Sequence, residues 1–162
     1  MRALVLGAET PAGRALAAAL AAAGARIALI ASTGDAETAF AVQRLARRLG
    51  ALSQAIDATN EMAVRVMVRQ VSKALGGLDA VVFCAELGDA TPAAVDIALT
   101  YANREFHRRG GGTFIAAVSQ DTPAGIEEAP PGVGSMTVVR AADAEAVALR
   151  IVEALMGEPP GA

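Results

Sequence analysis

Short apolar runs alternate along the chain with longer segments in which apolar residues recur every three or four positions. Such runs are typical of buried strands, and the periodic segments are typical of amphipathic helices. The pattern predicts strands at residues 3–6, 26–31, 52–56, 78–84, 113–118 and 135–140. It predicts helices from Pro11 to Gly24, from the turn at 32–35 to Gly50, from Thr59 to Gly76, over 92–109, and from Asp143 to Gly157.

Strands that alternate with helices at this spacing predict a doubly wound α/β fold. We expect a parallel sheet in the order 3-2-1-4-5-6, with right-handed crossovers and helices on both faces. A chain of 162 residues is expected to form one domain. We place that domain at residues 1–157 and a flexible tail at 158–162. Three prolines and three glycines in residues 120–134 predict a loop there.

Two details of the helices can be read from single residues. Phe40, Leu45 and Leu49 are expected on the inner side of the second helix. The hydroxyl of Thr59 is expected to cap the third helix.

The helix predicted over residues 92–109 is apolar on more than one side. One side must cover the sheet, yet the apolar residues are too many for one side: Ala93, Ala94, Val95, Ile97, Ala98, Leu99, Tyr101 and Ala102. A large exposed apolar patch favours association. We therefore expect a twofold homodimer, or a heteromer with a full-length relative, through this helix.

Composition and charge exclude several classes of function. The chain is 54% hydrophobic but only 3% aromatic, so small residues must pack helices closely on the sheet. A net charge of −3 and the absence of a basic face argue against nucleic-acid binding. No stretch is long and apolar enough for a membrane span. Cys84 is the only cysteine, which excludes an intrachain disulfide and favours a reduced compartment, with the cytoplasm as the default.

The N-terminal strand, glycine turn and helix carry the clearest chemical signal. Gly7 ends the first apolar run and Gly13 follows six residues later, inside the start of an alanine-rich helix. Glycine at the first position permits a sharp turn, and at the second it permits close packing of helix and sheet. Thr10 and Pro11 suit the cap and first position of that helix. The helix N-terminus then faces an anion such as a pyrophosphate.

Several colinear motifs resemble the short-chain dehydrogenase/reductase family, from the N-terminus to about Ser119. The family's TGxxxGxG turn is similar to residues 6–14, and its Asp-Val after strand three to Asp57-Ala58. Its Gly-x-Leu-Asp-x-Leu-Val-Asn-Asn-Ala-Gly segment is similar to residues 76–86, and its Gly-Gly-x-Ile-Val-Asn-Ile-Ser-Ser strand to residues 111–119. The turn keeps only its outer glycines, and Glu86 stands where the family has a glycine near the cofactor.

The resemblance implies a binding site for NAD(P) or another adenine nucleotide. The residues implied in the site are Gly7, Glu9, Thr10, Gly13, Ser32, Thr33, Asp57, Ala58 and Ala85. In the family the residue at the Asp57 position touches the adenine, although Asp57 can equally end the third strand and cap the next helix. Ser32 and Thr33 offer neither the acid that binds ribose hydroxyls nor an arginine for a 2′-phosphate. Their small hydroxyls leave the cofactor open, with a slight preference for NADP.

The family's proton relay is absent from this sequence. That relay is a Tyr-x-x-x-Lys pair a dozen or so residues beyond a serine, which Ser119 matches, but residues 127–134 contain neither type. The one tyrosine, Tyr101, and the one lysine, Lys73, lie on earlier helices. No metal site is readable, and neither His107 nor Cys84 has a partner at suitable spacing.

Three functions therefore stay open. The chain is a degenerate dehydrogenase-like domain that binds a dinucleotide without reducing carbonyls by the family mechanism. Alternatively, it is an active oxidoreductase in which Tyr101, Glu86 or a partner subunit replaces the lost acid. The third alternative is an association module.

Overall fold

The computed structural model describes residues 1–119, 136–140 and 143–157 and contains a six-stranded sheet in which every pairing is parallel. The strand order is β3-β2-β1-β4-β5-β6, which confirms the order predicted from the sequence. The strands are β1 (Arg2–Leu6), β2 (Arg26–Ala31), β3 (Leu52–Ala55), β4 (Ala80–Ala85), β5 (Thr113–Val118) and β6 (Met136–Arg140). The helices are α1 (Pro11–Ala22), α2 (Ala36–Leu49), α3 (Glu61–Leu75), α4 (Thr91–Arg109) and α5 (Ala144–Met156), with a short 3-10 helix η1 (Gly88–Ala90) before α4.

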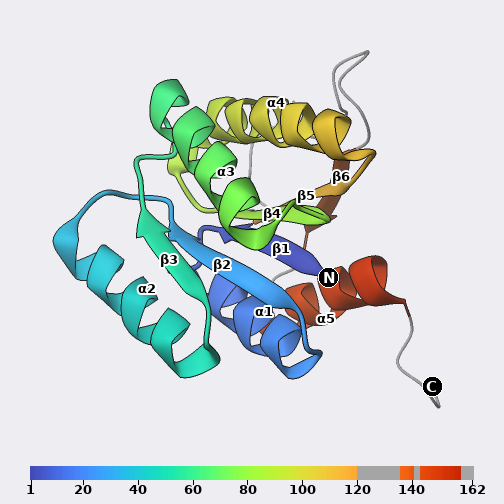
Figure 1. Cartoon of the computed structure of the whole chain (residues 1–162). Coiled ribbons are helices and arrows are strands. Elements are labelled where there is room, and N and C mark those ends of the chain that lie inside the picture. Colours follow the sequence, from blue (N-terminus) through green and yellow to red (C-terminus); the bar gives the residue numbers. More distant parts are fainter. Residues whose placement is uncertain (120–135, 141–142, 158–162) are drawn as a thin grey trace.

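Helices cover both faces of the sheet (Figure 1). Helices α3 and α4 lie on one face, and α1, α2 and α5 lie on the other. Alternate residues of β1 divide between the two cores: Leu4 and Leu6 pack toward α3 and α4, whereas Ala3 and Val5 pack toward α1, α2 and α5. This alternation explains why the central strands read as continuous apolar runs.

Polar side chains that accept backbone N–H groups cap the starts of α1, α2, α3 and α5. Thr10 caps α1, Asp35 caps α2 and Asp143 caps α5. The prediction for α3 was wrong by one residue, because Asn60 caps it by accepting from the Ala63 amide at 3.0 Å. The hydroxyl of Thr59 instead donates to Asp57.

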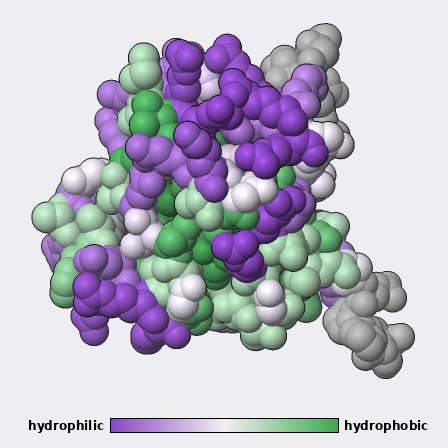
Figure 2. All heavy atoms as spheres, in the orientation of Figure 1, coloured by the Kyte–Doolittle hydropathy of each residue, from purple (hydrophilic) through white to green (hydrophobic). Residues whose placement is uncertain are grey.

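The predicted inner face of α2 is wrong at Phe40, which is 57% exposed. Its ring lies against the Arg44 guanidinium on the outer side of the helix, 5.8 Å from the ring centroid, as in a cation–π contact. The buried residues of α2 are Val42, Leu45 and Ala46. Apolar side chains also gather on the surface around α3 (Figure 2), where the exposed Met62 and Val66 and the half-buried Ile56 line part of a groove between β3 and α3.

Most of the apolar residues on the second side of α4 are covered by other elements of the same chain. Helix α4 contacts α3 as well as β4 and β5, so two of its sides are buried. The buried residues include Ala94, Val95, Ala98, Leu99, Tyr101 and Ala102. Only Ala93 is exposed and Ile97 half-buried among the apolar residues that favoured association. The expectation of a large uncovered apolar face on α4 is therefore wrong, because α3 covers the second apolar side.

Some expectations concern residues that the structure does not describe. The loop at 120–134, the first residue of the strand predicted at 135–140, and the tail at 158–162 lie outside the described residues. Within the described ranges, no helix is both long and apolar enough to cross a membrane.

Candidate functional site

The carboxyl ends of the parallel strands meet at one edge of the sheet. In doubly wound folds this edge carries the ligand site, where the order of the strands reverses. Here the reversal falls between β1 and β4, which are neighbours in the sheet. The structure brings all nine residues of the expected cofactor site to this edge, at the ends of β1, β2, β3 and β4 and in the turns that follow them.

The turn between β1 and α1 is built by close contact between backbone atoms. Gly7 has φ +81°, and a Cβ atom there would lie 2.1 Å from the Cys84 carbonyl oxygen. A Cβ atom on Gly13 would lie 2.2 Å from the Gly7 carbonyl oxygen. No side chain fits at either position without moving backbone, so both glycines are required by the packing of β1, β4 and α1.

Thr10 closes the same turn from inside. Its buried hydroxyl donates to the Gly7 carbonyl at 2.8 Å and accepts from the Gly13 amide at 3.0 Å. The first N–H groups of a helix have no intrahelical partner. Among the described residues, the Thr10 hydroxyl accepts from the Gly13 amide, whereas the Ala12 amide has no acceptor at the positive end of α1, where an anion is favoured.

Glu9 reaches from the turn to the end of β2. Its carboxylate accepts hydrogen bonds from the Ser32 amide, at 2.8 Å to Oε1 and 3.3 Å to Oε2, and from the Ser32 hydroxyl. The Ser32 carbonyl accepts from the Ala58 amide at 3.1 Å. Glu9, Ser32 and Ala58 thus form a hydrogen-bonded row across the ends of β1, β2 and β3. The sequence indicated all three as cofactor residues but did not reveal that Glu9 binds Ser32.

Thr33 and Asp57 are held in local turns. The Thr33 hydroxyl donates to Asp35 at 2.7 Å, so it is joined to the cap of α2. Asp57 accepts from the Thr59 amide at 2.9 Å and the Thr59 hydroxyl at 2.6 Å, and these hydrogen bonds hold the pKa of the exposed Asp57 carboxyl below its ordinary value. Asp57 therefore does not cap α3, and its carboxylate stays open to solvent at the ligand edge.

The end of β4 adds a third carboxylate to the edge, after those of Glu9 and Asp57. Ala85 is buried, and Glu86 after it is exposed. Burial raises the pKa of the Cys84 thiol to about 12, with smaller contributions from the charges of Glu9 and Glu86. Cys84 is therefore a buried, protonated thiol and not a nucleophile. Because two carboxylates act on it, this part of the edge is acidic.

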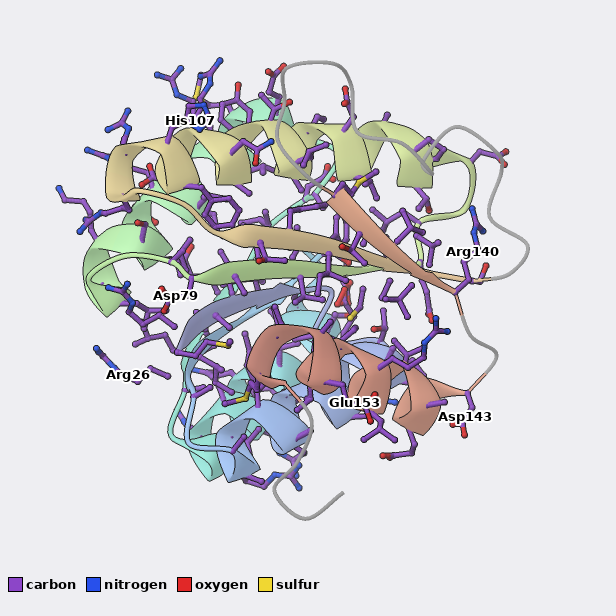
Figure 3. The ribbon with its side chains drawn as sticks, turned by 90° about the vertical axis from the view of Figure 1, so that its right-hand side faces the viewer. Arg26, Asp79, His107, Arg140, Asp143 and Glu153 are labelled. Carbon is purple, nitrogen blue, oxygen red and sulfur yellow. The ribbon has the colours of Figure 1, made fainter. Side chains whose placement is uncertain are left out.

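Ser119 follows β5 directly and is exposed, at the edge where the resemblance places the serine that holds a carbonyl. Its own carbonyl accepts a hydrogen bond from Arg140 Nη1 at 3.0 Å. Figure 3 shows Arg140 at the tip of β6, across the sheet from Asp79 at the opposite edge. Sequence reasoning missed Arg140, because only the pairing of β5 with β6 brings it to Ser119.

Tyr101 does not lie at the turn between β1 and α1. Its hydroxyl donates to Glu61 at 2.7 Å, and its ring lies 4.8 Å from the Arg104 guanidinium carbon. It belongs to the core between α3 and α4, on the face of the sheet opposite α1. We therefore drop Tyr101 as a replacement acid, because its proton is directed to Glu61 and away from the Gly7–Gly13 turn.

A metal site is not formed by the part of the chain that the structure describes, where no three His, Cys, Asp or Glu side chains gather. His107 is exposed at the far end of α4 and points away from the sheet (Figure 3). The described chemistry of the edge is thus a helix N-terminus, backbone amides, hydroxyls and the carboxylates of Glu9, Asp57 and Glu86.

These features define a doubly wound α/β domain of the Rossmann type, the class of fold that binds dinucleotides at this edge. The short chain dehydrogenase family matches residues 1–119, which is most of the chain. The chain belongs to the short-chain dehydrogenase/reductase family. No curated protein matches it.

Solved structures agree with the family. A short-chain type dehydrogenase/reductase from Mycobacterium marinum is 29% identical with a TM-score of 0.63, and the match covers 73% of this chain and 55% of that chain. One from Mycobacterium ulcerans is 28% identical with a TM-score of 0.60, covering 73% and 50%. An NADPH-dependent 3-quinuclidinone reductase from Rhodotorula rubra, 24% identical with a TM-score of 0.58 and covering 73% and 52%, shows the shared fold. The chain thus spans about half the length of the structures it matches.

Proposed function

We propose that this chain binds a nicotinamide dinucleotide at the turn between β1 and α1 and does not by itself reduce carbonyls by the family mechanism. The observation that carries the proposal is the turn geometry. Two glycines whose Cβ positions are filled by backbone atoms bring the N-terminus of α1 against the sheet, with Thr10 as the cap. This arrangement fits a pyrophosphate, which accepts hydrogen bonds from free amides and is favoured by the helix dipole.

The residues present fit one half of the cofactor better than the other. The adenosine half is served by the ends of β2 and β3, where Ser32, Asp57 and Ala58 lie. When bound, a nicotinamide ring supplies a hydride acceptor or donor. Proton transfer at the substrate oxygen needs a positioned acid. The described edge offers Ser119 and Glu86 but neither a tyrosine nor a lysine.

The binding half of the proposal is tested with an acidic residue at the helix start. In Ala12→Asp the new carboxylate lies in the first turn of α1, where it stabilises the helix but repels a pyrophosphate. NADH fluorescence should change and then saturate as purified wild-type protein is added. The affinity of Ala12→Asp for NADH should be lower by about tenfold or more. Ala18→Asp, on the exposed middle of the same helix, is the matched control and should bind as the wild type does.

The catalytic half is tested with a panel of carbonyl substrates and both reduced cofactors. The purified chain should show no turnover. Turnover that Ser119→Ala abolishes would overturn this half and favour the alternative, an active oxidoreductase in which Glu86 or a partner subunit supplies the acid. Binding that is equally strong in Ala12→Asp would instead overturn the first half.

Association through residues 92–109, as a homodimer or with a full-length relative, is a second and narrower proposal. It is supported by the outer side of α4, where Ala93 is exposed and Ile97 half-buried. Ile97→Glu should lower the sedimentation coefficient of a dimer, whereas Ala41→Glu on the exposed side of α2 should not. A monomeric wild type rules the proposal out.

Cytoplasmic location also stays a proposal, and it rests on the single buried Cys84.

A further inference from the structure

The hydrogen bonds between Glu9 and Ser32 occupy the position at which dinucleotide-binding folds distinguish NAD from NADP. In such folds the end of β2 holds an acid that binds the ribose hydroxyls or a cation that binds the 2′-phosphate. Here the residue directly after β2 is Ser32, which is buried and carries no charge. The charge at this position comes from Glu9, which the β1–α1 turn supplies.

The donors that a 2′-phosphate needs are already used. Both the amide and the hydroxyl of Ser32 donate to the Glu9 carboxylate, mainly to Oε1. A phosphate bound there would lose these donors and would meet a carboxylate at close range, and a phosphate monoester carries roughly −1.5 to −2 charges near neutral pH. Like charges in contact strongly disfavour binding. The hydroxyls of Ser32 and Thr33, which favoured NADP in the sequence, therefore do not form an open phosphate site.

Ribose hydroxyls meet the opposite situation. An ionised carboxylate has about four acceptor positions and can accept more bonds than Ser32 provides. Oε2 accepts only the long 3.3 Å bond from the Ser32 amide, so it retains acceptor capacity. Glu9 is half-buried, and this oxygen can accept from a ribose diol without displacing Ser32.

Arg14, in the first turn of α1, is directed to the backbone of Glu9. Its Nη1 donates to the Glu9 carbonyl at 2.7 Å, and the part of the chain that the structure describes shows no ion pair between Arg14 and the Glu9 carboxylate. Arg14 therefore does not neutralise the Glu9 carboxylate.

The geometry points to Glu9 as the residue that selects NAD(H) over NADP(H), by occupying Ser32 and presenting Oε2 to the ribose diol. This inference rests on the proposed dinucleotide binding. It reverses the slight preference for NADP drawn from the sequence, because the acid is contributed by the glycine turn and not by the residue after β2.

The test compares NADH and NADPH binding by calorimetry in the wild type, Glu9→Gln, Ser32→Ala and Glu86→Gln. The wild type should bind NADH about tenfold or more tightly than NADPH. Glu9→Gln should bring the two affinities close together, chiefly by improving NADPH. Ser32→Ala keeps the Glu9 charge and should keep the preference for NADH. Glu86→Gln removes the carboxylate that follows β4 and should change both affinities by the same factor.

The outcomes separate this inference from the function on which it rests. Equal binding of both cofactors to the wild type, or an unchanged ratio in Glu9→Gln, overturns the role of Glu9 and leaves dinucleotide binding intact. A complete lack of binding to the wild type and every variant overturns both. Circular dichroism shows whether Glu9→Gln folds, and Glu9→Ala removes the same charge if it does not. The ratio of the NADH and NADPH affinities of the wild type also decides by itself, because equal affinities overturn the inference.

Discussion

The β1–α1 turn and the seam between α3 and α4 differ in what holds them together. The turn contains few large side chains and depends on backbone atoms in contact, with Gly7 and Gly13 at its two ends. The seam, defined here as Glu61, Arg69, Tyr101, Arg104 and Glu105, is rich in ionisable groups. Tyr101 donates to Glu61, and Arg69 pairs with Glu105 at 3.3 Å.

This difference shows that chemically reactive residue types do not by themselves mark the site. The seam holds a tyrosine, two carboxylates and two arginines, yet it lies on the opposite face of the sheet from α1 and joins two helices. The turn has little such chemistry, yet it presents backbone amides at the ligand edge. The ligand binding proposed for the turn rests on its shape and on the helix dipole, whereas the side chains of the seam hold α3 against α4.

The largest effect on stability should come from adding one methyl group to the β1–α1 turn. Gly13→Ala places a Cβ 2.2 Å from the Gly7 carbonyl oxygen and 2.8 Å from the Ala8 Cα, and both atoms belong to the backbone. We expect a loss of about 2–3 kcal/mol in the free energy of unfolding, or failure to fold. Urea denaturation followed by circular dichroism measures it.

Gly34→Ala is the matched control for the turn. Gly34 has no heavy atom within 4 Å of an added Cβ and no positive φ. Its free energy of unfolding should change by less than about 0.5 kcal/mol. Equal midpoints for Gly13→Ala and Gly34→Ala would contradict the view that backbone contact holds the turn.

A smaller loss of stability is expected when the ion pair of the seam is broken by replacing its exposed partner, Arg69. The Glu105 side chain is 6% exposed and that of Arg69 is 46% exposed, and Glu105 Oε2 has no hydrogen-bond partner among the described residues. Arg69→Ala leaves a buried carboxylate without its cation and should cost about 1–3 kcal/mol. In urea titrations, adding Glu105→Gln to Arg69→Ala should restore part of that loss, because the buried group is then neutral. Strictly additive effects of the two substitutions would show that the pair is not coupled.

The smallest effect on stability concerns Tyr101, and it is lost at alkaline pH. The hydrogen bond to Glu61, with burial and the Glu61 charge, raises the pKa of Tyr101 above its ordinary value of 10.0. The folded state thus holds the proton more tightly than the unfolded state, so this stabilisation is complete below pH 10.0 and is lost as the pH rises through the raised pKa. Tyr101→Phe should be slightly less stable than the wild type near neutral pH, and the gap should narrow at alkaline pH. Denaturation curves of the two proteins that shift in parallel with pH would contradict this.

Much of the architecture follows from the sequence by itself. Apolar runs and helical periodicity placed the six strands and five helices, and right-handed crossovers limited the strand order. Gly7 and Gly13 were recognisable because the demands of a sharp turn and a close helix are local and only glycine meets them. The ligand edge also followed, because the carboxyl ends of parallel strands must lie together.

Contacts between side chains of distant elements were decided only by the tertiary structure. Glu9 and Ser32 are separated by 23 positions, and Tyr101 and Glu61 by 40. Periodicity shows that a side of α4 is apolar but not that α3 covers it, and it could not show that Phe40 lies outside against Arg44. The physical reason is that the pattern of a segment depends on its own backbone geometry. The partner of a side chain depends on how two elements are placed against each other, which the packing of the whole domain determines.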